Sequence, residues 1–258
     1  MVKILVAAPT FKGMKYCQDE FFLRIKNLKG SYDILIVDNS KDDEYFKELN
    51  NINGIKVIHD ATIEEKSVFR LISSRNLILR YGIDNNYTHI LMLDSDVIPP
   101  ENIIEELLKW DKGIISGVYF NYFNINNKKQ LLPVVWKYLT EKEFEELKKN
   151  YPKYSNLKSR TEIKRHITKE EIDSDELHEV AVPSAGCMLI RRDVFKKVKY
   201  GKFKETGADD DIYFIEKARE FGFEPYCYTK VKCNHLVADK YKKDNKGNLI
   251  HSSFSDML

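Results

Sequence analysis

The stretch HILMLDSD, residues 89–96, carries the strongest signal in the sequence. Its largely apolar part, His89–Leu93, predicts a buried strand that ends at two carboxylates, Asp94 and Asp96. Side chains two positions apart lie on the same side of an extended backbone, so these carboxylates repel each other unless a cation lies beside them. A hard divalent ion with oxygen ligands suits such a site. A solvated Asp-Ser-Asp turn leading to Pro99 explains the same residues without a ligand, and the motif alone does not separate the two interpretations.

Short apolar strands alternate with amphipathic helices through the first half of the chain. Strands are expected at Lys3–Ala8, Asp33–Val37 and Lys56–Ile58, and helices at Met14–Leu28, Ser67–Arg80 and from Pro99 onward. This alternation predicts βαβ units, and therefore an α/β fold with a mostly parallel sheet flanked by helices.

Polar side chains follow the predicted strands at the points where the strands end. Thr10 follows the first strand, Asp38 the second, and Asp94 and Asp96 the fourth. Ligands of parallel sheets bind at the carboxyl ends of the strands. We therefore expect these side chains to line one site.

The second half of the chain has a less regular pattern. Strands are expected at Gly113–Phe120, Leu131–Tyr138, Val180–Arg191 and Glu224–Lys232. A highly charged helix capped at Thr140 precedes the polar segment Tyr151–Glu179. This region is expected to form an insertion or flap rather than a separate domain.

Three consecutive carboxylates, Asp209, Asp210 and Asp211, open a predicted helix that extends to Phe221. Acidic residues complement the dipole at a helix N-terminus. Three of them also repel one another, which raises the pKa of at least one and favours a general base.

Two further residues are candidates by residue type. His235 follows the last predicted strand, and one histidine with two carboxylates suits Mn²⁺ better than Ca²⁺, although a lone histidine is more often structural. Arg75, followed by Asn76, interrupts a predicted helix and offers a bidentate phosphate partner, with a surface arginine as the alternative.

The composition excludes several classes of protein. Hydrophobic residues make up 43% of the chain, which excludes wholesale disorder. The 42 lysines and arginines nearly balance the 40 aspartates and glutamates, so the global positive field of a general nucleic-acid binder is absent. No apolar run approaches the roughly 18 residues that span a bilayer, so we expect a cytoplasmic protein that is at most peripheral to a membrane. The scattered cysteines predict buried thiols.

The order of these signals resembles that of the GT-A fold glycosyltransferases, and most closely that of the inverting, family 2-like enzymes. The resemblance is carried by AAPT at 7–10, VDNS at 37–40, SRN at 74–76, LDSD at 93–96, AGCMLI at 185–190, the acidic cluster and His235. It extends from Lys3 to about Leu236. It implies a Rossmann-like sheet in a single domain over 1–258, with a nucleotide-binding half at about 1–112, an acceptor and catalytic half at 113–236 that contains a charged insertion at about 138–179, and a flexible tail at 237–258.

The resemblance assigns nucleotide-sugar contacts mainly to the first half. It implies that Pro9 and Thr10 line the nucleotide cleft, that Asp38 reads the base with Asn39 beside it, and that Arg75 lies near the nucleotide or its diphosphate. Ser95 and Gly186 belong to the same group, since the glycine lets the backbone approach the sugar.

The resemblance also implies the metal and catalytic residues. Asp94 would face the ribose and the metal, Asp96 would ligate Mn²⁺ or Mg²⁺, and His235 would complete the metal site. Asp211 would be the catalytic base, with Asp210 as the acidic residue before it. The additional Asp209 makes this assignment ambiguous by one position.

The implied activity is metal-dependent transfer of a sugar from a nucleoside-diphosphate sugar to an acceptor hydroxyl, with inversion. A UDP-sugar is favoured over a GDP-sugar, and the acceptor is a glycan, a lipid-linked molecule or a small molecule. Three alternatives stay open: a sugar-phosphate nucleotidyltransferase, a retaining transferase on the same fold, and a non-catalytic nucleotide-sugar binding module.

Overall fold

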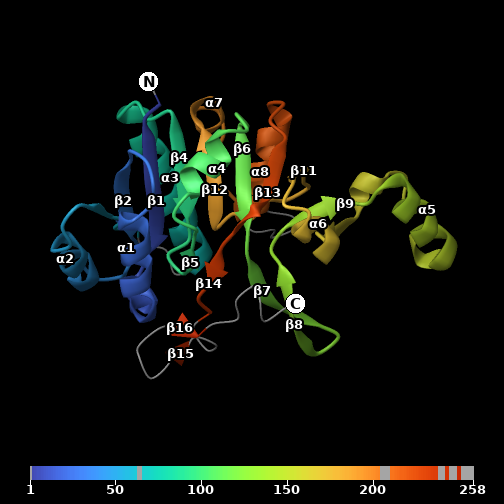
Figure 1. The fold of residues 1–258 in the computed structure, drawn as a ribbon, viewed down its shortest axis with the longest axis horizontal. Coiled ribbons are helices and arrows are strands. Elements are labelled where there is room, and N and C mark those ends of the chain that lie inside the picture. The colour runs from blue at the N-terminus through green and yellow to red at the C-terminus, as the bar shows by residue number, and fades with distance from the viewer. Residues whose placement is uncertain (1, 63–65, 204–209, 238–241, 244–248, 251–258) are drawn as a thin grey trace.

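The computed structural model describes residues 2–62, 66–203, 210–237, 242–243 and 249–250. Its centre is an eight-stranded sheet in the order β11-β13-β6-β12-β4-β1-β2-β3 (Figure 1). These strands are β1 (Ile4–Thr10), β2 (Asp33–Asp38), β3 (Lys56–His59), β4 (His89–Leu93), β6 (Ile114–Val118), β11 (Leu177–Glu179), β12 (Cys187–Arg191) and β13 (Pro225–Lys232). All of them run in one direction except β12 and β11, which are antiparallel to their neighbours. The predicted α/β fold with a mostly parallel sheet is confirmed.

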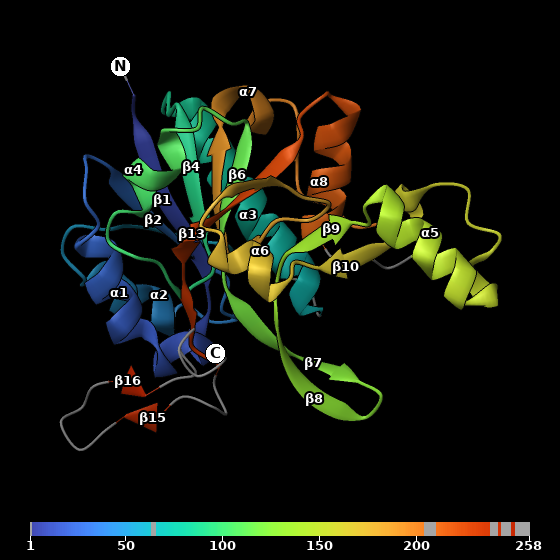
Figure 2. The same ribbon diagram turned by 45° about the vertical axis from the view of Figure 1, so that its right-hand side comes forward.

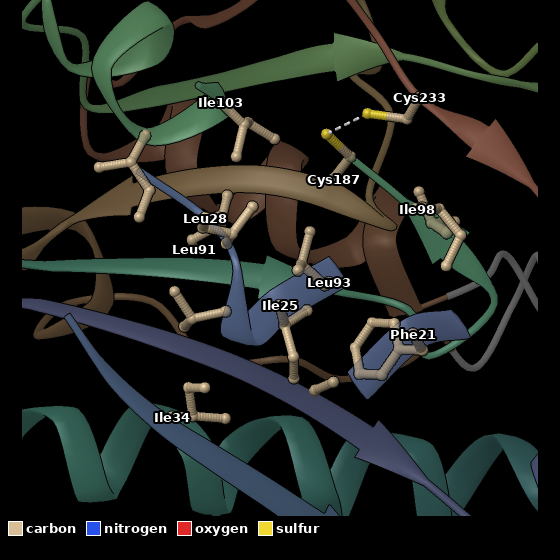
Figure 3. Close-up of a cluster of buried hydrophobic side chains, with 14 of the residues drawn as sticks. Phe21, Ile25, Leu28, Ile34, Leu91, Leu93, Ile98, Ile103, Cys187 and Cys233 are labelled. Atoms are coloured by element: carbon tan, nitrogen blue, oxygen red, sulfur yellow. Dashed lines mark hydrogen bonds between the residues drawn. The ribbon is translucent and has the colours of Figure 1, made fainter. Parts of the chain in front are cut away.

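Helices cover both faces of the sheet. The first face packs against α1 (Gln18–Lys26), α2 (Glu44–Asn50) and α4 (Ile103–Leu108), and the second against α3 (Ser67–Asp84), α7 (Arg192–Phe195) and α8 (Asp210–Glu220). Strand β1 is buried on both faces, because Val6 shares a cluster with Phe21 while Leu5 shares another with Ile78. Figure 3 shows the first cluster around Phe21 and Leu93. The continuous apolar pattern of β1 therefore reports a three-layer arrangement.

Several short elements gather beyond one end of the sheet. Strands β5 (Val97–Ile98) and β14 (Asn234–His235) pair there, and a 3₁₀ turn, Lys12–Tyr16, precedes α1. The hairpin of β7 (Phe120–Ile125) and β8 (Lys128–Pro133) extends past them (Figure 1). Its turn residues, Asn126 and Asn127, have φ angles of 51° and 61°, which suit a two-residue hairpin loop. The hairpin is not among the predicted elements.

The charged insertion is more regular than its polarity predicts. Strand β9 (Trp136–Tyr138) leads into it. It contains α5 (Glu141–Asn150), β10 (Lys164–His166), α6 (Lys169–Asp173) and 3₁₀ turns at Pro152–Tyr154 and Arg160–Glu162. Figure 2 shows α5 extending away from the sheet. Capping boxes begin at Thr140, Ser159 and Thr168, so local hydrogen bonds define these elements in place of a large apolar core.

The ends of several predicted elements differ from the structure. The strand expected over Val180–Arg191 begins only at Cys187, because residues 183–184 are irregular and 185–186 form a turn. The strand expected over Leu131–Tyr138 is divided between β8 and β9. Most of the predicted tail 237–258 lies outside the described residues, apart from the paired strands β15 (Lys242–Lys243) and β16 (Leu249–Ile250). In the described part of the chain, no helix has both the length and the apolar character needed to cross a membrane.

Candidate functional site

Two adjoining cavities lie at the carboxyl ends of β1, β2 and β4. The first has a volume of about 460 Å³ and the second about 250 Å³. Both are lined by Phe11, Asn39, Leu71, Asp94 and Tyr119. The first is also lined by Arg75, Asp210 and Asp211, and the second by Pro9, Thr10, Ser95, Asp96 and His235. Asp94 therefore borders both cavities, and most of the predicted site residues line one or the other.

The location of the cavities follows from the topology. The backbone N–H of Asn39 donates to the carbonyl of Thr10 over 2.9 Å, which joins the ends of β1 and β2. A larger hollow of about 830 Å³ lies at the amino ends of the strands, beside Asp33 and Lys56. None of the predicted site residues that the structure describes lines that hollow.

Arg75 links the two acidic motifs. Its Nη2 donates to Asp94 Oδ1 over 2.7 Å, and its Nη1 donates to Asp210 Oδ2 over 2.6 Å. The residue is 3% exposed. Burial opposes its charge, but Asp94 and Asp210 outweigh that effect and hold the pKa of Arg75 well above its usual value. The structure thus gives Arg75 two carboxylate partners, and its predicted contact with a diphosphate stays a prediction.

The two described carboxylates at the start of α8 differ in their surroundings. Asp210 is 4% exposed and its carboxylate is paired with Arg75. Asp211 is half-buried on the wall of the first cavity, and its Oδ1 accepts from the N–H of Ile212 over 2.7 Å. Asp209 lies outside the described residues. The geometry therefore gives Asp211 the more accessible carboxylate.

His235 and Asp96 face each other on the second cavity. Strand β14 pairs with β5 in a register that places His235 opposite Val97, next to Asp96. His235 Nδ1 bonds to the carbonyl of Phe120 over 2.9 Å and must therefore carry a proton. Its Nε2 lies 3.3 Å from Asp96 Oδ2. Burial lowers the pKa of His235, but the hydrogen bond and charge of Asp96 outweigh burial and raise it.

This pair offers two ligands to a cation. In neutral His235 the Nε2 lone pair points at a carboxylate oxygen, an arrangement that a cation between the two atoms would relieve. Among the residues that the structure describes, no group of three or more potential ligands gathers. An ion held by Asp96 and His235 therefore needs ligands beyond these two side chains.

Gly186 permits a close approach of neighbouring groups. A Cβ at this position would lie 2.6 Å from Asp94 Oδ2 and 2.8 Å from the Tyr119 hydroxyl. The N–H of Asp94 also donates to the Gly186 carbonyl over 3.0 Å. Burial and the charges of Asp94 and Asp96 hold the pKa of Tyr119 well above its usual value, so its hydroxyl keeps its proton.

Asp38 is saturated by internal hydrogen bonds. Its Oδ1 accepts from the N–H of Ser40 over 3.1 Å and from the Ser40 hydroxyl over 2.6 Å, while its Oδ2 accepts from His59 Nδ1 over 3.1 Å. Asp38 is 0% exposed and is not among the described residues that line the two cavities, whereas Asn39 lines both. Base reading by Asp38 stays a prediction.

The similarity of this chain to known proteins lies in its structure and not in its sequence. The chain matches no protein-family model and no curated protein sequence. It is similar to GalNAc-T7, solved with UDP, GalNAc and Mn²⁺, with a TM-score of 0.57 and 12% identity over 92% of this chain and 44% of that one. It is also similar to the mannosyltransferase PcManGT from Pyrobaculum calidifontis, in complex with GDP-Man and Mn²⁺, with a TM-score of 0.53 and 11% identity over 91% of this chain and 57% of that one. TarS from S. aureus gives a TM-score of 0.52 and 13% identity over 93% and 37% of the two chains.

The fold is GT-A-like. The chain spans well under two thirds of the length of each of these three proteins. At identities of 11–13% the likeness establishes the fold alone, and the Rossmann-like arrangement inferred from the sequence is confirmed.

Three aromatic residues of this GT-A-like chain lie at the site, and two of them, Phe11 and Tyr200, were not assigned to it from the sequence. Phe11 is 46% exposed and lines both cavities. Tyr119 also lines both cavities, and its ring contacts that of His235 at 5.2 Å between centroids. Tyr200 lies beneath the Arg75 guanidinium. An aromatic residue directly after a predicted buried strand was a local signal for Phe11, whereas nothing local indicated Tyr200.

Proposed function

We propose that this protein is a metal-dependent glycosyltransferase that moves a sugar from a nucleoside-diphosphate sugar to an acceptor hydroxyl with inversion. The observation that carries the proposal is the position of Asp94, which joins a cavity lined by Asp211 to a cavity lined by Asp96 and His235. The residues that could bind a metal ion therefore lie in a cavity next to the one that contains the accessible carboxylate of Asp211. The Mn²⁺ and nucleotide sugars or products bound by GalNAc-T7 and PcManGT support the same class of donor.

Asp96 and His235 would hold the metal ion, Mn²⁺ or Mg²⁺. Their facing oxygen and nitrogen atoms, 3.3 Å apart, fit a cation that takes its remaining ligands from diphosphate oxygens. When bound, such an ion supplies neutralisation of the negative charge on a diphosphate leaving group. Asp94, paired on one oxygen with Arg75, leaves its second oxygen beside Gly186 for the donor.

Asp211 would act as the general base. It would take the proton of the acceptor hydroxyl while that oxygen attacks the anomeric carbon from the face opposite the diphosphate, which inverts the configuration. Asp210 cannot serve equally well, because its carboxylate is buried and held in an ion pair with the Arg75 guanidinium. Arg75 then acts in the free protein by bridging the carboxylates of Asp94 and Asp210.

The nucleotide base would lie at the end of the site near Phe11. The half-exposed ring of Phe11 offers a stacking surface, and Asn39 lies on the wall of both cavities. The Asn39 Nδ2 donates to Ser74 over 3.1 Å, which holds the side-chain amide in place. We favour a UDP-sugar as the donor.

The proposal is tested by product analysis with UDP- and GDP-sugars in Mn²⁺. We expect release of the nucleoside diphosphate, slowly with water and faster with an acceptor, and loss of both in Asp211→Asn. Release of pyrophosphate from a nucleoside triphosphate and a sugar phosphate would replace the proposal with a nucleotidyltransferase. Retention of the anomeric configuration would remove Asp211 from the role of base.

A further inference from the structure

Asn76 follows Arg75 in α3 but has no part in the proposed reaction. Its side-chain amide bonds the main chain of Tyr200 in both directions: Nδ2 donates to the Tyr200 carbonyl over 3.0 Å, and Oδ1 accepts from the Tyr200 N–H over 2.9 Å. Tyr200 lies 124 residues away in sequence and belongs to no helix or strand. These two hydrogen bonds hold the loop that contains Tyr200 against α3.

The ring of Tyr200 carries this attachment to α8. It stacks on Phe214 with 4.4 Å between centroids and 17° between planes. Phe214 lies three positions after Asp211, so the two side chains share one side of the helix. Tyr200 is buried, and its hydroxyl has no hydrogen-bond partner among the residues that the structure describes, so the contacts seen there come from its ring and its main chain.

A second contact joins the same loop to α8. A Cβ at Gly201 would lie 2.7 Å from the ring of Tyr213, so the residue after Tyr200 lies directly against the helix. The Arg75 guanidinium carbon lies 5.3 Å from the centroid of the Tyr200 ring. The SRN motif therefore reaches the first turn of α8 by two routes: Arg75 pairs with Asp210, and Asn76 acts through Tyr200.

We propose that Asn76 is a positioning residue, which sets the location of the first turn of α8, and hence of Asp211, through Tyr200 and Phe214. The expected effect of Asn76 on catalysis rests on the proposed function, whereas its expected effect on the position of α8 does not. A catalytic group displaced by about 1 Å costs roughly 10²-fold in rate. Losing the two bonds of Asn76 releases the loop from α3 but leaves the cavities and the metal ligands in place.

The test compares Asn76→Ala with Asn85→Ala. Asn85 ends the same helix and also donates to a backbone carbonyl, that of Tyr81, over 2.9 Å, but it lies at the opposite end of α3 from the site. Hydrogen exchange of α8 is measured in the free proteins. We expect exchange in residues 210–216 to rise at least tenfold in Asn76→Ala and to stay at the wild-type rate in Asn85→Ala. Unchanged protection of α8 in Asn76→Ala would overturn the proposal.

Kinetics separates this inference from the proposed function. With UDP or GDP and Mn²⁺, we expect Asn76→Ala to bind nucleotide within threefold of wild type while its kcat for donor turnover falls at least tenfold. Equal losses in nucleotide affinity and kcat would identify a general structural role and contradict positioning. If the wild-type protein turns over no nucleotide sugar, the proposed function fails. The exchange experiment then still decides whether Asn76 positions the first turn of α8. Where Asn76→Ala does not fold, Asn76→Asp keeps the acceptor for the Tyr200 N–H, and we expect an intermediate rise in exchange.

Discussion

The guanidinium of Arg75 donates to the carboxylate of Asp210 over 2.6 Å, and this bond joins α3 to the first turn of α8 across 135 residues of sequence. The same side chain also binds Asp94 at the end of β4. Helix α3, helix α8 and the end of β4 therefore meet at the buried guanidinium of Arg75. The proposed base, Asp211, is the next residue after Asp210.

Replacing Arg75 should destabilise the fold. Arg75→Ala leaves two carboxylates without their partner, and breaking a buried ion pair costs about 3–5 kcal/mol. Arg75→Lys should recover only part of this, since one ammonium does not reproduce a fork that reaches two acids. Urea unfolding measures the effect, with the exposed Arg80→Ala in the same helix as the control. Equal stability of Arg75→Ala and Arg80→Ala would contradict the bridging role.

Asp210 and Asp211 should separate stability from turnover. Asp210→Asn removes the charge that faces Arg75 and should lower the free energy of unfolding by roughly 2 kcal/mol or more. Asp211→Asn should leave stability within about 0.5 kcal/mol but abolish sugar transfer. Thermal unfolding and product release on the same two proteins test both statements. The reverse pattern would exchange the two roles.

Gly186→Ala should damage the site more than the fold. The added Cβ would displace the Asp94 carboxylate or the Tyr119 hydroxyl, with a stability loss of about 1–3 kcal/mol. We expect Mn²⁺-dependent nucleotide affinity to fall at least tenfold by calorimetry. Gly54→Ala is the control, because it is strained by a backbone φ of 81° yet has nothing within 4 Å, and it should lose stability with unchanged affinity. Unaltered nucleotide affinity in Gly186→Ala would show that nucleotide binding does not depend on the close approach at Gly186.

The insertion should show acid sensitivity through Glu171. Burial opposes its charge, but hydrogen bonds from Arg165, Lys137 and Thr168 outweigh burial and lower the pKa of Glu171 to about 2. A lowered pKa in the folded state gives stability that is present above about pH 4.5 and is lost as pH falls toward 2. Glu171→Gln should therefore be less stable than wild type at pH 7, by about 3 kcal/mol, and the difference should vanish near pH 2. A difference independent of pH would show that charge is not its cause.

The fold and the strand-end residues were predictable because they depend on local patterns. Alternating apolar strands and amphipathic helices predict the parallel sheet, and parallel strands bring Thr10 and Asp94 to one edge. Both residues line the cavities there. Such inferences need only periodicity and chain direction.

The partners of these residues were not predictable, because they are set by packing. Nothing local to Arg75 indicates that it meets Asp210 and Asp94, and nothing local to Asp38 indicates that His59, 21 residues later, bonds to its second oxygen. The order within the insertion was missed for a related reason. The helix capped at Thr140 was predicted, but the elements after it depend on the capping boxes at Ser159 and Thr168 and on ion pairs, and a polar sequence without apolar periodicity favours a loop.

The central claim is that Asp96 and His235 hold a metal ion to which a nucleoside diphosphate binds at this site. The most direct measurement is thermal unfolding with UDP or GDP, with and without Mn²⁺, in wild type and in Asp96→Ala. We predict a rise in melting temperature that requires one nucleotide together with Mn²⁺, corresponding to roughly 2.7 kcal/mol at 100 times the dissociation constant, and that disappears in Asp96→Ala. An equal rise in Asp96→Ala, or no rise with either nucleotide in folded wild-type protein, would contradict the account.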